Sequence, residues 1–120
     1  TVHVNLTEAT HHLISREELR KMKSSSVLVN ASRGGVIDPQ ALYEALRDGE
    51  ITYAALDVTE PEPIPEDDPL LSLPNCIVVP HIGSASIATR TKMATMAAEN
   101  LLAGLRGEPL PNCVNPEVQA

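Results

Sequence analysis

Aromatic side chains are almost missing from this chain of 120 residues, which has no Phe, no Trp and only two tyrosines, Tyr43 and Tyr53. Its core must therefore be built from Val, Ile, Leu, Ala and Met. Aliphatic side chains of this kind suit helices packed on a parallel β-sheet. The length is enough for one small domain.

Basic residues are also scarce, because 9 Lys and Arg stand against 16 Asp and Glu and give a net charge of −7. They form no run, whereas a phosphate backbone selects for clustered cations. No apolar stretch reaches the roughly 18 residues that a membrane span requires. We therefore expect no nucleic-acid partner and no membrane partner.

Cysteine is rare too, and Cys76 and Cys113 lie too far apart to form a C-x-x-C motif. The four histidines show no spacing typical of metal ligands, so no metal is expected. This pattern favours a reducing, cytoplasmic location. The chain begins with Thr1 rather than Met, which we interpret as a sign of a fragment, so a missing targeting segment carries no information.

Apolar runs that predict strands alternate with segments that predict helices. The predicted strands cover residues 1–5, 27–29, 53–58 and 77–79. Helix starts are indicated by Ser15 with Glu18, a capping box, and by Asp38 followed by Pro39. A third helix is predicted over 86–105, from apolar residues at helical spacing. Residues 59–74 hold five of the ten prolines and predict a loop with one short helical turn.

This alternation predicts an α/β fold with a parallel sheet, in which ligands bind beyond the carboxyl ends of the strands. Arg33 follows the second strand, Asp57 ends the third with Glu62 five residues later, and His81 follows the fourth. We therefore expect these four side chains to meet in one cleft. Arg33 could hold a substrate carboxylate with its planar fork.

In that cleft His81 could pass a proton to a ketone oxygen, and Glu62 could orient its ring and favour the protonated form. The accompanying hydride requires a cofactor, since no side chain carries one. Each residue also has a structural interpretation. Arg33 and Glu62 could be solvated surface charges, Asp57 could cap a loop, and His81 could be structural.

Three segments resemble motifs of the D-isomer-specific 2-hydroxyacid dehydrogenases, and they occur in the order found in that family. They are Val29-Asn30-Ala31-Ser32-Arg33-Gly34, then Ala55-Leu56-Asp57-Val58 with Glu60-Pro61-Glu62-Pro63, and Val79-Pro80-His81-Ile82-Gly83-Ser84-Ala85. The resemblance implies that Arg33 binds the substrate carboxylate, that His81 is the acid and base, and that Glu62 is its partner. It also implies a cofactor site lined by Asn5, Ala31, Arg33, Asp57, His81 and Gly83, with Asp57 facing the nicotinamide.

The resemblance further implies a Rossmann-like NAD(P)-binding domain, of which residues 1–86 would form the second half. Residues 87–120 would be a connecting helix and a tail that returns to a substrate domain. The glycines lie at 34, 35, 49, 83, 104 and 107 and make no G-x-G-x-x-G turn. The cofactor could therefore be NAD or NADP, and we expect the chain alone to be inactive.

Within the family, the segments 57–59 and 100–109 are similar to glyoxylate/hydroxypyruvate reductases. This similarity implies a reductase of small 2-keto acids that forms a homodimer at full length. A second hypothesis is a non-enzymatic, NAD-sensing binding protein on the same fold, like the C-terminal-binding transcriptional corepressors. A third is a fragment with no activity.

Overall fold

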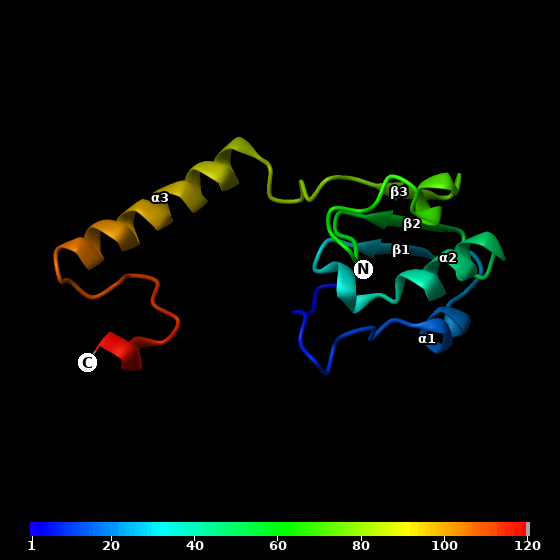
Figure 1. The fold of residues 1–120 in the computed structure, drawn as a ribbon, viewed down its shortest axis with the longest axis horizontal. Helices are drawn as coiled ribbons and strands as arrows, with labels where there is room; N and C mark the ends of the chain where they lie inside the picture. The colour runs from blue at the N-terminus through cyan, green and yellow to red at the C-terminus, as the bar shows by residue number, and fades with distance from the viewer. Residues whose placement is uncertain (120) are drawn as a thin grey trace. The chain divides into compact units, whose positions relative to one another are not determined.

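The computed structural model describes residues 1–119 and divides the chain into two compact units, Thr1–Gly83 and Ser84–Ala120. The sequence placed the end of the cofactor domain after residue 86, and this domain boundary stays a prediction. In Figure 1 the first unit holds the strands and the second holds the long helix.

The first unit contains a parallel sheet with the strand order β1-β2-β3, as the sequence predicted. Its strands are β1 (Val27–Asn30), β2 (Tyr53–Leu56) and β3 (Cys76–Val78). The prediction for β2 extended two residues too far, because Asp57 already turns to the loop that follows. Residues 1–5 form no full strand, and only Val2 makes a parallel bridge, to Asn30.

Two α-helices of this unit begin where capping residues indicated. Helix α1 covers Arg16–Lys21, and the Glu18 carboxylate accepts the backbone N–H of Ser15. Helix α2 covers Pro39–Arg47, and the Asp38 carboxylate accepts the N–H groups of the second and third helical residues. Short 3₁₀ turns cover Gly34–Val36 (η1) and Pro69–Ser72 (η2), the latter within the proline-rich loop.

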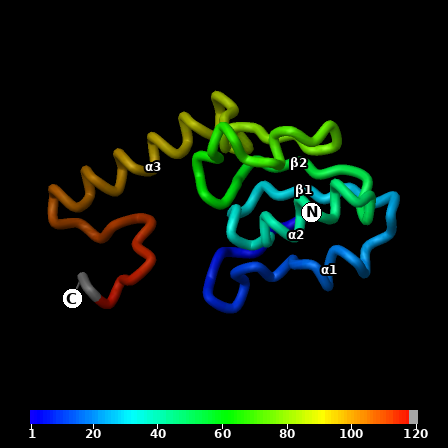
Figure 2. The backbone as a smooth tube through the Cα atoms, turned by 45° about the vertical axis from the view of Figure 1, so that its right-hand side comes forward, coloured from blue at the N-terminus to red at the C-terminus, as the bar shows by residue number. Residues whose placement is uncertain are grey.

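The sheet has one covered face and one open face. In both views α1 and α2 lie on the same side of the strands (Figure 1, Figure 2). On that side Leu28, Ala54 and Leu56 are buried in a core that includes Leu42 and Leu46 of α2. On the other side the register aligns Val29, Ala55 and Ile77, and both Val29 and Ile77 are exposed. The open face is thus an apolar surface that these helices do not cover.

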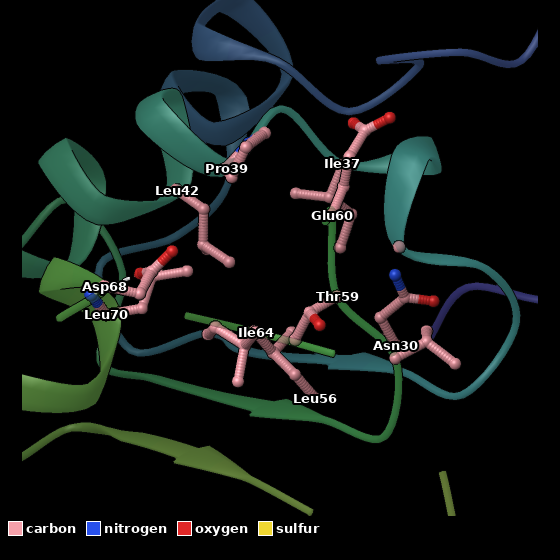
Figure 3. A pocket seen from close by; sticks show the side chains of 12 residues that line it. Asn30, Ile37, Pro39, Leu42, Leu56, Thr59, Glu60, Ile64, Asp68 and Leu70 are labelled. Atoms are coloured by element: carbon pink, nitrogen blue, oxygen red, sulfur yellow. Dashed lines mark hydrogen bonds between the residues drawn. The ribbon is translucent and has the colours of Figure 1, made fainter. Parts of the chain in front are cut away.

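A cavity of about 20 Å³ lies between α2 and the loop that follows β2 (Figure 3). Apolar side chains such as Leu42, Leu56 and Ile64 line it together with Asn30 and Thr59. This volume corresponds to about one water molecule. The loop of residues 58–70 is therefore packed closely against α2 and the sheet.

The second unit consists of α3 (Ile87–Leu105), a tail and the short turn η3 (Pro116–Gln119). Ser86 caps α3 by accepting the N–H of Thr89 at 3.1 Å, at the start that the sequence predicted. The tail folds back on the helix, because Asn100 and Asn112 exchange hydrogen bonds of 2.9 and 3.0 Å. Within residues 1–119, none of the helices has the length and apolar character needed to cross a bilayer.

Candidate active site

The carboxyl ends of the three strands place the predicted site residues along one edge of the sheet. Arg33 follows β1, Asp57 directly follows β2, and His81 follows β3. Because neighbouring strands are parallel, these ends lie side by side. This arrangement of Arg33, Asp57 and His81 is the one that the sequence predicted.

The loop that carries Arg33 is organised by Asn30, the last residue of β1. The Asn30 side chain is 1% exposed and donates a hydrogen bond to the Arg33 carbonyl oxygen at 2.9 Å. Its amide oxygen accepts hydrogen bonds from the backbone and the hydroxyl of Ser32, at 3.1 and 2.9 Å. A buried amide with all these partners fixes the backbone from which Arg33 projects.

The Arg33 side chain itself lies at the surface. Its Nη1 donates to the Ser32 carbonyl at 2.7 Å. Within the described part of the chain, Arg33 makes no salt bridge with a carboxylate. The guanidinium therefore retains donors that can bind an anion.

Asp57 holds the loop after β3. Its backbone carbonyl accepts the N–H of His81 at 3.0 Å. Its carboxylate accepts the N–H of Ile82 at 2.6 Å through one oxygen and the N–H of Gly83 at 2.8 Å through the other. The family resemblance implied that Asp57 faces the nicotinamide, and this stays a prediction. The contacts show that Asp57 holds the loop of residues 81–83 in place.

His81 adopts a left-handed backbone conformation, with φ of 52°. Residues other than glycine adopt this conformation only where surrounding contacts fix it, and such positions often occur at functional sites. The three hydrogen bonds that Asp57 accepts from the backbone of His81, Ile82 and Gly83 supply those contacts. His81 is thus presented at the end of β3 by a backbone that Asp57 constrains.

Glu62 and His81 form a direct pair across the cleft. The Glu62 carboxylate lies 2.6 Å from Nδ1 of His81, although nineteen residues separate the two in the sequence. Both side chains are partly exposed, at 42% and 49%. Because Nδ1 faces Glu62, Nε2 is the nitrogen that remains available to a substrate.

The site residues line two hollows of the first unit. One, of about 480 Å³, contains Asp57, Glu62 and His81 between the apolar side chains of Ile64, Leu71 and Val78. The other, of about 600 Å³, is lined by Asn5, Ala31 and Arg33 with their neighbours. The structure therefore brings Glu62 and His81 together directly. Arg33 lines a separate hollow with Asn5 and Ala31, rather than the one cleft that the sequence predicted for all four side chains.

Sequence reasoning missed Asn30 and a cluster formed by His11, His12 and Glu60. Asn30 lay within the Arg33 motif, but nothing in the pattern showed that its side chain is buried. Both histidines contact Glu60, which is 48 and 49 residues away. No sequence spacing could reveal that cluster, because two separate loops create it.

Comparisons with known proteins agree with this geometry. Residues 1–83 match the family model of the D-isomer specific 2-hydroxyacid dehydrogenase NAD binding domain. The chain is 58% identical to glyoxylate reductase of Korarchaeum cryptofilum. The matched region covers 98% of this chain and 36% of the relative. It thus spans about a third of the length of such a relative.

Solved structures show the same fold. The crystal structure of the TT0316 protein from Thermus thermophilus superposes with a TM-score of 0.89 at 52% identity, over 93% of this chain and 36% of that one. An NADPH-dependent glyoxylate/hydroxypyruvate reductase from Sinorhizobium meliloti, in complex with NADP and malonate, gives a TM-score of 0.74 at 41% identity, over 81% and 30% of the two chains. With its motifs, fold and matched residues, the chain belongs to the D-isomer specific 2-hydroxyacid dehydrogenase family, and residues 1–83 are part of the NAD binding domain.

Proposed function

We propose that the complete protein containing this chain reduces small 2-keto acids to D-2-hydroxy acids with NADH or NADPH, with glyoxylate and hydroxypyruvate as substrates. The observation that carries this proposal is the Glu62–His81 pair, at 2.6 Å, at the strand edge that also presents Arg33. An imidazole beside a carboxylate is suited to general acid catalysis. The names of the related reductases support the choice of substrates.

His81 would donate the proton. Its Nδ1 is engaged by Glu62, so the Nε2 proton would pass to the ketone oxygen as that oxygen becomes a hydroxyl. Glu62 would stabilise the imidazolium and keep the ring in one orientation. Arg33, which has free donors in the hollow lined by Asn5 and Ala31, would bind the carboxylate of the substrate and thereby orient its ketone.

The residues present fit a nicotinamide cofactor. Gly83 lies so close to Asp57 that an added Cβ atom would come within 2.8 Å of its carboxylate, so the loop beside the proposed site takes glycine here. The hollow beside Asn5, Ala31 and Arg33 has a volume of about 600 Å³. When bound, the nicotinamide supplies the hydride that no side chain carries.

A steady-state assay of the complete protein tests the proposal. We expect oxidation of NADH or NADPH that depends on glyoxylate or hydroxypyruvate. No turnover of either acid with either cofactor, from folded protein, would contradict the proposed function. Such a result, together with cofactor binding, would instead favour the non-enzymatic binding protein.

We also propose that the complete protein is a cytoplasmic homodimer. The free cysteines Cys76 and Cys113 suit a reducing compartment. Analytical ultracentrifugation of the complete protein would measure its oligomeric state, and a single monomeric species would contradict the dimer.

A further inference from the structure

A cluster of ionisable side chains lies outside the proton-transfer pair. His11 contacts one Glu60 oxygen through Nε2 at 3.2 Å, and His12 contacts the other through Nε2 at 2.8 Å. We name these three residues the His–Glu clamp. The Glu60 carboxylate is turned away from Leu42 and Leu56 of the neighbouring cavity (Figure 3). The clamp therefore belongs to the surface of the first unit, where it joins two loops.

The clamp is not arranged as a metal site, although its three donor atoms lie within 4.8 Å of one another. A bound ion must lie near the plane of each imidazole, at about 2.0–2.1 Å from its nitrogen. The two rings are stacked, with centroids 3.9 Å apart and planes inclined by 21°. Such planes do not meet within bonding distance, so the arrangement suits two hydrogen bonds to one carboxylate instead.

The clamp brings together the loops that carry Arg33 and Glu62. The His12 backbone N–H donates to the Gly35 carbonyl at 2.8 Å, two residues after Arg33. A Cβ atom at Gly35 would approach the Glu60 carboxylate to 2.9 Å, and one at Gly34 would approach the Thr59 carbonyl to 1.9 Å. The 34–35 backbone and residues 59–60 are therefore in close contact.

The loop that carries Glu62 makes few other hydrogen bonds to the rest of the unit. Proline at 61 and 63 removes backbone N–H donors on both sides of Glu62. Within the described part of the chain, the side-chain hydrogen bonds from residues 59–63 to other segments come only from Glu60 and Glu62. Glu60 is thus the side chain that ties this loop to the rest of the unit on the side away from His81.

The charge state of Glu60 favours this attachment. The hydrogen bond from His12 lowers the pKa of the Glu60 carboxyl below its usual value; partial burial opposes the shift and the hydrogen bond from His11 adds to it. The carboxylate is therefore ionised at neutral pH and accepts from both rings.

We propose that Glu60 is a positioning residue for the reaction: with His11 and His12 it holds the Glu62 loop where the Glu62 carboxylate meets His81. The inference rests on the proposed function. Glu60 lies two residues before Glu62 and does not contact His81, so it acts through Glu62. Losing it would free the loop and loosen the 2.6 Å contact between Glu62 and His81.

A double-mutant cycle in the complete protein tests this coupling, with the variants Glu60→Ala, Glu62→Gln and the combination. We expect Glu60→Ala to lower kcat about tenfold. This is the lower end of the roughly 10- to 100-fold loss that follows when a group supporting a functional residue is removed. In the Glu62→Gln background the same change should have little further effect, because the residue through which Glu60 acts is already disabled. The dependence of kcat on pH in Glu60→Ala should change in the same way as in Glu62→Gln.

The control is Glu50→Gln, which removes another ion-paired carboxylate, the partner of Arg20, and should leave kcat unchanged. Effects of Glu60→Ala and Glu62→Gln that multiply in the combined variant would overturn the proposal. An unchanged pH profile in Glu60→Ala would do the same. If Glu60→Ala does not fold, Glu60→Gln replaces it in the cycle, since it keeps one acceptor oxygen.

A second readout separates this inference from the proposed function. If the wild type reduces neither keto acid, the function fails, and the clamp is then tested by NMR of ¹⁵N-labelled His81. We expect the imidazole resonances in Glu60→Ala, or in Glu60→Gln if it replaced that variant, to shift toward those of Glu62→Gln. Resonances identical to the wild type would show that Glu62 stays in place without the clamp.

Discussion

The Asp57 carboxylate accepts the backbone N–H of Gly83 at 2.8 Å, and a side chain at position 83 would occupy the space of that same carboxylate. Asp57, the residue directly after β2, thus holds the loop that follows β3. Since Asp57 also binds the backbone of His81 and Ile82, the placement of the His81 imidazole depends on these contacts.

Gly83→Ala should therefore impair the reaction by displacing the His81 loop. We expect a fall in kcat of about 10²-fold, the scale for a misplacement of about 1 Å. Steady-state kinetics of the complete protein would measure it. Gly104→Ala in α3, whose added Cβ meets only the flexible Leu110 side chain, is the control and should keep wild-type kinetics. Equal kinetics for both variants would show that the 83 backbone need not approach Asp57.

Glu62→Gln should slow keto acid reduction and change its dependence on pH. The proposed proton donor His81 would lose the charged partner that lies 2.6 Å from its Nδ1, and a neutral amide forms a weaker hydrogen bond there. A profile of kcat against pH would measure the change, and a profile superimposable on that of the wild type would remove Glu62 from the proton transfer.

Arg33→Lys should be nearly as harmful as Arg33→Ala, because an ammonium cannot reproduce a bidentate fork. Loss of a hydrogen-bonded charge pair on the substrate should lower kcat/KM by about 10- to 100-fold. Arg47→Lys is the matched control, since Arg47 forms its salt bridge with the neighbouring Asp48 and lies over the Tyr43 ring, at the end of α2. Normal kinetics in Arg33→Lys would mean that Arg33 acts only as a point charge.

Cys76 should react slowly with alkylating reagents. Burial, assisted by the charge of Asp68, raises the pKa of the Cys76 thiol to about 11. At pH 8 only roughly one thiol in a thousand would then be the reactive thiolate. Mass spectrometry after timed iodoacetamide treatment would measure this, with denatured protein as the control. Alkylation as fast as in denatured protein would contradict the described packing of β3.

The elements could be predicted because their signals are local. Asp38 and Pro39 mark the start of α2, and Ser86 marks the start of α3. In both helices the side chain of the capping residue accepts backbone N–H groups of the first turn. The parallel sheet followed from the alternation of elements. The extent of β2 was less predictable, since Val58 is apolar and buried yet lies beyond the last residue of the strand.

The sequence predicted those site residues that lie in recognisable motifs, but not the contacts between loops. Strand order brought Arg33, Asp57 and His81 to one edge, and Glu62 was predicted from its position five residues after Asp57, with the family resemblance implying its role. The fastening of Gly83 by Asp57 and the contacts of Glu60 with both histidines arise from loops that meet in three dimensions. Such contacts leave no periodicity or short spacing in a single sequence.

The kinetics of His81→Ala in the complete protein show whether the His81 side chain is the proton donor. We predict a fall in kcat of roughly 10²- to 10⁴-fold, the usual scale for loss of a general acid. Cofactor binding, followed by NADH or NADPH fluorescence, should persist, because the Asp57 contacts reach the His81 backbone rather than its ring. Wild-type turnover of glyoxylate and hydroxypyruvate by the folded variant would contradict the account, since it would place the proton source elsewhere.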